Sequence, residues 1–417
     1  MPVQTDVKRL LALLVGGNPL PNYLSALALR PDKIVLVHSP QTQRAAENLQ
    51  RTLTNAPDLR TEIELACVPD AASAAEVRQT LKRLMGSHSR GWHILLNYTG
   101  GTKVMAASAA RVFYENGGNS ADASYLDDGG PDASPRLRFD NGEVRTLSEL
   151  QTPPLALETV LNLHGCRLQR STRKEPAPTP EDINEIARKV LSEPSLAGCL
   201  HGQMKEAFPK EDPQRCLETP FDPQALDLQL SIGKFPTEEQ IGGLSRQERE
   251  SWFQQWRRFL SGCWLEDWVA SRIRETGLLS EGCEVVSGFY VFRQGAGESR
   301  PPQSEIDVAL VRNYRSYFIS CTTAADKATC KQKLFEIAVR SRQLAGDLAR
   351  PALVCLADGG TLSELRAEVG DEPSPTGAFR VRGLMSVHVF GLEDLRTWAG
   401  WQGAPPNLES LKKWLES

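Results

Sequence analysis

Four short apolar runs in the first hundred residues limit the folds open to this chain. Each run is rich in leucine, isoleucine or valine, and together they span residues 10–16, 33–39, 62–68 and 92–98. Near-continuous apolar strands of this kind belong to parallel sheets that are covered on both faces. Helical patterns separate the runs, at residues 20–29, 42–52 and 71–85. This alternation predicts a doubly wound, Rossmann-like sheet.

The composition indicates a soluble protein of more than one domain. A chain of 417 residues exceeds one ordinary core, and its formal net charge of -4 argues against wholesale electrostatic coating of nucleic acid. The nine cysteines form no C-x-x-C pair, which disfavours zinc ribbons, and their odd number suits a reducing, cytoplasmic location. We find no leader-like N-terminus and no apolar run of bilayer length, so we expect no membrane association.

The pattern along the chain divides it into three parts. Residues 1–150 carry the predicted sheet and end in a hairpin, which Asn141-Gly142 between alternating residues predicts. Residues 151–250 read as a connector, partly helical, with helices over 155–164 and 183–208. Residues 251–417 restart as a mixed α/β fold that opens on one tryptophan-rich helix. Its tryptophans fall at helical spacing, which favours core packing over base stacking: Trp252, Trp256, Trp264 and Trp268.

A glycine turn follows the fourth apolar run. Residues 98–103, Tyr-Thr-Gly-Gly-Thr-Lys, place backbone amides, two hydroxyls and an ammonium group at the start of a helix. Such a helix start favours an anion. The spacing fits neither a Walker A loop nor a dinucleotide-binding loop, so a nicotinamide-dependent enzyme is disfavoured. From this turn alone, a plain tight connection with a surface lysine is equally open.

Two further loops favour a binding site over a plain tight connection. Gly16-Gly17-Asn18-Pro19 follows the first run, and residues 37–42 follow the second. Loops at the carboxyl ends of neighbouring strands converge on one crevice in a doubly wound sheet. The three loops therefore predict one site for a phosphate-bearing ligand. Its candidate residues are Gly17, Asn18, Pro19, Ser39, Thr42, Thr99, Gly100, Gly101, Thr102 and Lys103.

These loops carry a family resemblance. The sequences LVGGNPLPNYLSAL, KIVLVHSPQT and LLNYTGGTKVMA resemble CARF domains, the sensors of type III CRISPR antiviral defence. The likeness is especially close to effectors that fuse this sensor to a PD-(D/E)XK, restriction-endonuclease-like nuclease. The resemblance covers about the first 150 residues and implies a cyclic oligoadenylate ligand, such as cyclic tetra- or hexa-adenylate. It also implies a homodimer, with the ligand across its two-fold axis.

The last part resembles the nuclease of the same fusion family, with one departure. GCWLEDW places Glu266 as an active-site acid, and SEIDVALV places Asp307 as the metal-binding aspartate beside Glu305. Where the family has its E-x-K pair, this chain has Ser320 and Thr322. The resemblance implies Mg²⁺ or Mn²⁺ held by Glu266, Asp307 and the backbone of Cys321. A displaced lysine remains available on the following helix: Lys327, Lys331 or Lys333.

The leading interpretation is therefore a metal-dependent nuclease activated by cyclic oligoadenylate. Its substrate would be single-stranded DNA or RNA, or plasmid DNA that it nicks. In a second interpretation the nuclease domain has lost its chemistry and acts by binding or by recruiting a partner, for which Ser320 and Thr322 argue. In a third, the sensor degrades its own ligand with help from Thr99, Thr102 and Lys103. From the residues alone, Glu305 and Asp307 also fit a solvated strand edge, and Glu266 an exposed helix acid.

Overall fold

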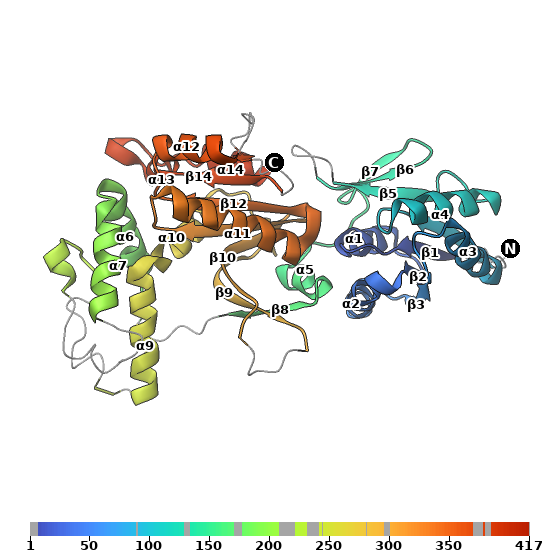
Figure 1. Ribbon diagram of the computed structural model, residues 1–417, viewed down its shortest axis with the longest axis horizontal. Coiled ribbons are helices and arrows are strands. Elements are labelled where there is room, and N and C mark those ends of the chain that lie inside the picture. The colour runs from blue at the N-terminus through green and yellow to red at the C-terminus, as the bar shows by residue number, and fades with distance from the viewer. Residues whose placement is uncertain are drawn as a thin grey trace, which may run out of the picture.

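Two seven-stranded mixed sheets lie side by side along the long axis of the molecule (Figure 1). The coordinates are a computed structural model. It describes residues 7–88, 91–128, 134–170, 177–207, 222–231, 242–243, 245–280, 282–295, 301–369, 378–379 and 385–416. In this part of the chain no helix is both long and apolar enough to cross a bilayer.

The first sheet has the strand order β3-β2-β1-β4-β5-β6-β7. Its first five strands are parallel, which confirms the predicted doubly wound arrangement, and β6 and β7 are antiparallel. The predicted hairpin at Asn141-Gly142 joins β6 to β7. The strands are β1 (Lys8–Leu14), β2 (Lys33–His38), β3 (Glu62–Cys67), β4 (Trp92–Asn97), β5 (Ala123–Asp127), β6 (Arg136–Phe139) and β7 (Val144–Thr146).

Helices cover both faces of this sheet. Leu11 and Leu13 of β1 pack into the cluster that contains α1 and α2, whereas Leu10, Ala12 and Leu14 pack into the cluster that contains α3 and α4. Side chains of a strand alternate between its faces, so a strand buried on both sides must be apolar throughout. This is why β1 reads as a continuous apolar run. The helices are α1 (Leu20–Leu29), α2 (Gln43–Thr54), α3 (Ala74–His88) and α4 (Lys103–Glu115).

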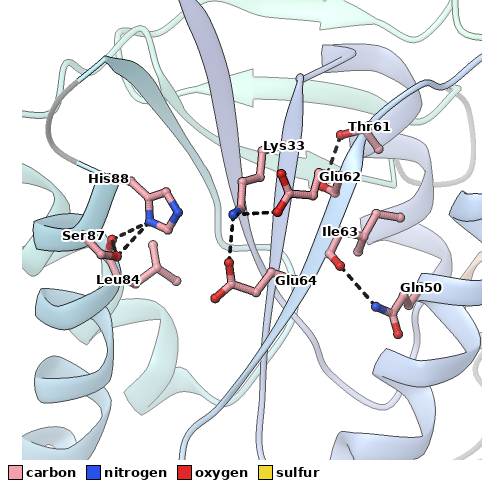
Figure 2. Close-up of polar contacts among 9 residues, drawn as sticks. All are labelled: Lys33, Gln50, Thr61, Glu62, Ile63, Glu64, Leu84, Ser87 and His88. Atoms are coloured by element: carbon pink, nitrogen blue, oxygen red, sulfur yellow. Dashed lines mark hydrogen bonds and ion pairs between the residues drawn. The ribbon is translucent and has the colours of Figure 1, made fainter.

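One lysine is buried at the start of β2. Lys33 is 8% exposed, and its Nζ lies 3.0 Å from a carboxylate oxygen of Glu62 and 3.0 Å from one of Glu64, both on β3 (Figure 2). A buried charge is tolerated when it is paired, and two partners satisfy this ammonium group. The same two glutamates place charge on β3, the edge strand of the sheet, where it opposes pairing with another chain.

The second sheet has the order β13-β14-β12-β11-β10-β9-β8. Neighbours from β8 to β11 are antiparallel, and β11, β12 and β14 are parallel. Residues 166–170, within the stretch that we predicted to be a connector, form its edge strand β8. The strands are β8 (Cys166–Arg170), β9 (Val285–Arg293), β10 (Ser304–Arg312), β11 (Arg315–Thr322), β12 (Ala349–Cys355), β13 (Ala378–Phe379) and β14 (Val387–Phe390).

One face of the second sheet carries α11 (Lys327–Ala345) and α12 (Gly359–Val369), of which the sequence did not predict α12. The other face packs against a core rich in tryptophan. The helices that contribute to this core are α6 (Pro180–Ser192), α7 (Ser195–Ala207), α9 (Arg246–Arg258), α10 (Trp264–Glu275), α13 (Leu392–Ala399) and α14 (Glu409–Glu416).

The tryptophan-rich segment is two helices, so the prediction of one was wrong. A π turn at Phe259–Cys263 separates α9 from α10, and Gly262 within it has a φ of 147°. Side chains other than glycine rarely adopt that backbone conformation. The prediction that the tryptophans pack in the core is confirmed, because Trp252, Trp256, Trp264 and Trp268 are each at most 2% exposed.

The two sheets share a hydrophobic core. A single cluster of buried side chains runs from β1, α1 and α2 through α5 (Leu157–Leu163) to β10 and α11. Figure 1 shows α5 between the two sheets, and α5 contacts α2, β8, β10 and α11. The two halves of the chain are therefore packed together rather than tethered by a linker.

We expect Trp268→Ala to lower the free energy of unfolding by about 3–5 kcal/mol, because a fully buried indole leaves a large cavity. Trp268 stacks on Trp398, with ring centroids 6.3 Å apart. Urea unfolding measures the change. Trp401→Ala is the control, since Trp401 is only partly buried, and its cost should stay near 1 kcal/mol. Equal costs for the two variants would contradict this packing.

Candidate functional sites

The loops after β1 and β4 meet at the carboxyl edge of the first sheet. A Cβ at Gly100 would lie 2.1 Å from the backbone oxygen of Leu14, and one at Gly16 would lie 3.0 Å from the backbone nitrogen of Gly101. Both glycines are therefore required for two backbones to approach each other. These strands are neighbours at the point where the strand order reverses, which is where ligands bind in doubly wound sheets.

Asn22, which the sequence analysis missed, holds this contact from α1. It is fully buried, its Nδ2 donates a hydrogen bond of 2.9 Å to the Leu14 oxygen, and its Oδ1 faces Gly100 without a hydrogen-bond partner in the described structure. The available signal was one amide side chain on a largely apolar helix, LPNYLSALAL. Buried polar side chains need partners, so a lone amide there indicated a backbone group to satisfy.

The threonines of the glycine turn bond to the protein itself. The Thr99 hydroxyl donates to Asn97 Oδ1 at 2.7 Å and accepts from the backbone of Leu126. The Thr102 hydroxyl accepts from the backbone of Met105, as the N-cap of α4, and donates to the Ala71 oxygen. Both hydroxyls therefore fix the shape of the turn.

Polar side chains of the loops after β2 and β1 also bond within the protein. Ser39 and Thr42, at the end of β2, form a capping box with each other. Asn18 accepts from the backbone of Leu20, and its side chain lies against Gly346, directly after α11. Gly346 has a φ of 66°, and a Cβ there would lie 2.3 Å from the Asn18 amide. Of the residues predicted to bind ligand, Asn18 thus contacts the second half of the chain.

Four predicted residues are exposed at this edge, whereas Pro19 is buried: Gly17, Gly101, Thr102 and Lys103. Lys103 opens α4 and pairs with no carboxylate in the described part of the chain. Lys103 therefore belongs to the same first turn as the free amides of the helix start, a combination of groups that suits an anion.

A second group of candidate residues lies where β10 and β11 pair. Asp307 Oδ2 accepts from the backbone nitrogen of Cys321 at 2.6 Å and from the Ser320 hydroxyl at 3.1 Å. Glu266 on α10 lies near it. Burial raises the pKa of Glu266 well above its usual range, and the Asp307 carboxylate raises it further. Gly288 on β9 makes room, since a Cβ there would lie 3.4 Å from Glu266 Oε2.

Burial also raises the pKa of Asp307, although the Cys321 N–H, Lys333 and Ser320 oppose this rise. Two carboxyl groups thus sit side by side in a partly buried position that disfavours their charged forms. The thiols of Cys263 and Cys321 lie beside them, and burial raises the pKa of each.

Of the three candidate lysines, Lys333 reaches this group. Lys333 and Arg340 of α11 line a small hollow of about 30 Å³ together with Glu305, Asp307 and Ser320. Lys327 and Lys331 turn toward α12 instead, where both pair with Glu368. Helix geometry explains why Lys331 and Lys333 have different neighbours, because residues two apart on a helix do not face the same way.

Two other predicted residues are engaged nearby. Glu305 is exposed and pairs with Arg258 of α9, whose guanidinium also donates to Tyr290. The Thr322 hydroxyl accepts from the backbone of Ala324 and so shapes the end of β11. The described residues contain no group of three or more His, Cys, Asp or Glu side chains arranged to hold a metal ion.

The fold and these two groups of residues define a two-sheet α/β protein, with the glycine-lined loop junction expected to form an anion crevice in one half and a pair of acids in the other. The chain shares its fold over 98% of its length with Can2 from Sulfobacillus thermosulfidooxidans, solved in complex with cyclic tetra-adenylate (TM-score 0.63, 16% identity, 100% of that chain covered). It is also similar to protein VC1899 from Vibrio cholerae (TM-score 0.61, 15% identity, 93% of this chain and 95% of that chain). No protein-family model and no curated protein sequence matches the chain.

We expect Glu266→Gln to stabilise the protein at neutral pH. A carboxyl group whose pKa is raised on folding pays a penalty once it ionises, and this penalty grows as the pH rises above the unfolded pKa of about 4.3. The amide carries no such penalty, so the gain in melting temperature should be present at pH 7 and vanish below about pH 4. Scanning calorimetry from pH 4 to 8 measures it.

Glu284→Gln is the control for that experiment. Hydrogen bonds from Arg170 lower the pKa of Glu284, so its stabilising effect is present above the unfolded pKa and is lost at low pH. The control should therefore lose stability at neutral pH. A loss of stability at neutral pH in both variants would contradict a raised pKa at Glu266.

Proposed function

We propose that this chain is a nuclease gated by cyclic oligoadenylate, acting on single-stranded DNA or RNA or nicking plasmid DNA. One observation carries the proposal: Glu266, Asp307 and Lys333 come from three separate elements and meet at one place. They do so in a chain whose whole length shares the fold of Can2, which was solved with a cyclic tetra-adenylate ligand.

The sensing half of the proposal rests on the crevice at Gly16 and Gly100. Exposed backbone at Gly17 and Gly101, with Lys103 beside it, suits the phosphates of a cyclic oligonucleotide. Such a ring has rotational symmetry, so two copies of the same crevice facing each other would bind it from both sides. The proposal therefore includes a homodimer.

The cutting half assigns roles to three side chains. Glu266 and Asp307 would hold Mg²⁺ or Mn²⁺, and a bound ion of this kind polarises a phosphate and stabilises the charge that develops on it. The two acids fit such an ion, since each carboxyl group has a raised pKa and a bound cation would favour its charged form, and Mg²⁺ is commonly bound by one or two carboxylates, with water and phosphate as its other ligands. Lys333 would bind the scissile phosphate or orient the attacking water, and Ser320 and the Cys321 N–H fix the direction of Asp307.

A second candidate function is sensing without cutting. The contact that favours it is the hydrogen bond from Ser320 to Asp307, where the resembling nucleases place a glutamate. A hydroxyl is a weaker ligand for a hard cation than a carboxylate. In this alternative the second sheet would pass the signal on through binding or recruitment of a partner.

We expect Lys103→Ala to weaken binding of cyclic tetra- or hexa-adenylate about tenfold, because it removes one charge-assisted contact to phosphate. Isothermal titration measures the change. Lys82→Ala is the control, since that exposed lysine of α3 pairs with Glu115 of α4. Gly100 is unsuitable for this test because any Cβ there collides with Leu14.

Unchanged binding in the Lys103 variant would contradict the crevice assignment. Light scattering of the same samples tests the dimer, and a monomeric mass with bound ligand would contradict the two-fold arrangement.

We expect cleavage of labelled single-stranded RNA, single-stranded DNA or supercoiled plasmid only when cyclic oligoadenylate and Mg²⁺ or Mn²⁺ are both present. Asp307→Ala should abolish the cleavage, and Lys333→Ala should slow it by about a hundredfold, which is the usual worth of a positioned proton-transfer group. Lys331→Ala is the matched control, since it lies on the same helix but pairs with Glu368.

Each result of this assay separates the two candidates. Cutting that depends on Asp307 and Lys333 supports the nuclease. Ligand binding without any cutting, together with no rise in melting temperature on adding Mn²⁺, would favour the sensor that does not cut. Equal slowing by the Lys331 and Lys333 variants would remove Lys333 from the site.

A further inference from the structure

A cavity of about 300 Å³ lies where the two halves of the chain join. Its walls come from the β1–α1 loop and α2 on one side, and from α5, β8, β9 and α11 on the other. It is separate from the acid pair, because no residue lines both hollows. Its volume suits a small organic molecule rather than a single ion.

The charged side chains that line this cavity are all positive. Arg44 of α2 and Arg293 of β9 line it, and no aspartate or glutamate does. Within the described residues neither arginine pairs with a carboxylate. Both lie close enough to Cys166, on the cavity wall, to oppose the rise that burial causes in the pKa of its thiol. Two unpaired guanidinium groups on one hollow suit a phosphate group, which they bind through paired hydrogen bonds.

His164 adds a second kind of contact to the same wall. Its Nδ1 lies 2.9 Å from the Val160 oxygen. A carbonyl only accepts, so this nitrogen carries the proton and Nε2 presents a lone pair. Nε2 is buried and has no hydrogen-bond partner in the described structure. Burial lowers the pKa of His164, which keeps the ring neutral at pH 7. The amides of Asn48, Gln303 and Gln343 also line the cavity.

We propose that this cavity binds a small phosphate ester that carries hydroxyl groups, of the size and chemistry of a ribonucleoside monophosphate. Arg44 and Arg293 bind the phosphate, and His164 Nε2 accepts from a ribose hydroxyl. The cavity shares two residues of the β1–α1 loop, Gly17 and Pro19, with the predicted crevice, but its arginines and its histidine lie outside the crevice loops. The site does not depend on the proposed nuclease activity. Because its walls belong to both halves of the chain, a bound molecule holds them together.

The test is titration calorimetry of the full chain with adenosine 5′-monophosphate. Arg44→Ala and Arg293→Ala should each weaken binding about tenfold, as expected for loss of one charge-assisted pair. Arg60→Ala is the control, since Arg60 is an exposed arginine outside the cavity. Lys103→Ala should leave this binding unchanged, which separates the cavity from the crevice.

The hydroxyl contact has its own test. The 2′,3′-dideoxy form of the nucleotide should bind wild-type protein less tightly than the ribonucleotide, and His164→Leu should remove that difference. Inorganic phosphate and a short single-stranded RNA, run as separate arms, distinguish a free nucleotide from the phosphates of a nucleic acid. Tighter binding of the RNA, with the same loss in both arginine variants, would overturn the assignment to a free nucleotide.

No binding of the nucleotide at millimolar concentration would overturn the proposal as a whole. So would equal loss in the Arg44, Arg293 and Arg60 variants, because binding would then follow net charge rather than this cavity. Both arginines are exposed at their tips, so their variants should fold, and a melting curve for each checks this.

Discussion

A continuous hydrophobic core joins the two sheets of this chain, and the remaining features depend on it. The cluster passes from β1 through α2 and α5 to α11. Burial of apolar surface is the main force that holds domains together, and a joint of this kind is stiff compared with a polar linker. The crevice of the first sheet, the cavity at the joint and the acid pair are therefore held in fixed relation by the packing between them.

The two candidate sites differ in the sign of their charge: one presents hydrogen-bond donors and a lysine, and the other presents two carboxyl groups. The crevice at Gly16 and Gly100 presents backbone amides and one lysine, and its hydroxyls are already bonded within the protein. The acid pair places two carboxyl groups together in a partly buried position, which costs stability until a proton or a cation arrives. Such strained placement of charge is typical of functional sites, although structural networks also produce it.

The first sheet could be predicted because each of its signals is local. The strand runs, the helix over Leu20–Leu29 and the hairpin at Asn141-Gly142 follow from periodicity and turn chemistry alone. The break at Gly262 and the strand at residues 166–170 could not be predicted in this way. The first depends on a single backbone angle, and the second depends on pairing with β9, which lies more than a hundred residues later. Side-chain partners were the least predictable part. Sequence placed Asn18 and the two threonines near a ligand, but the direction of each side chain is decided by tertiary neighbours.

One small contact deserves a mechanical interpretation. Asn18, in the loop that borders the crevice, lies against Gly346, and Gly346 directly follows the helix that carries Lys333 and Arg340. A helix rises about 1.5 Å per residue and moves along its axis as a stiff body. Asn18 therefore contacts one end of α11, and other residues of this helix lie beside the acid pair. Because a Cβ at position 346 would lie 2.3 Å from the asparagine amide, only glycine lets the loop and the end of α11 approach this closely, so a change at either one is felt by the other.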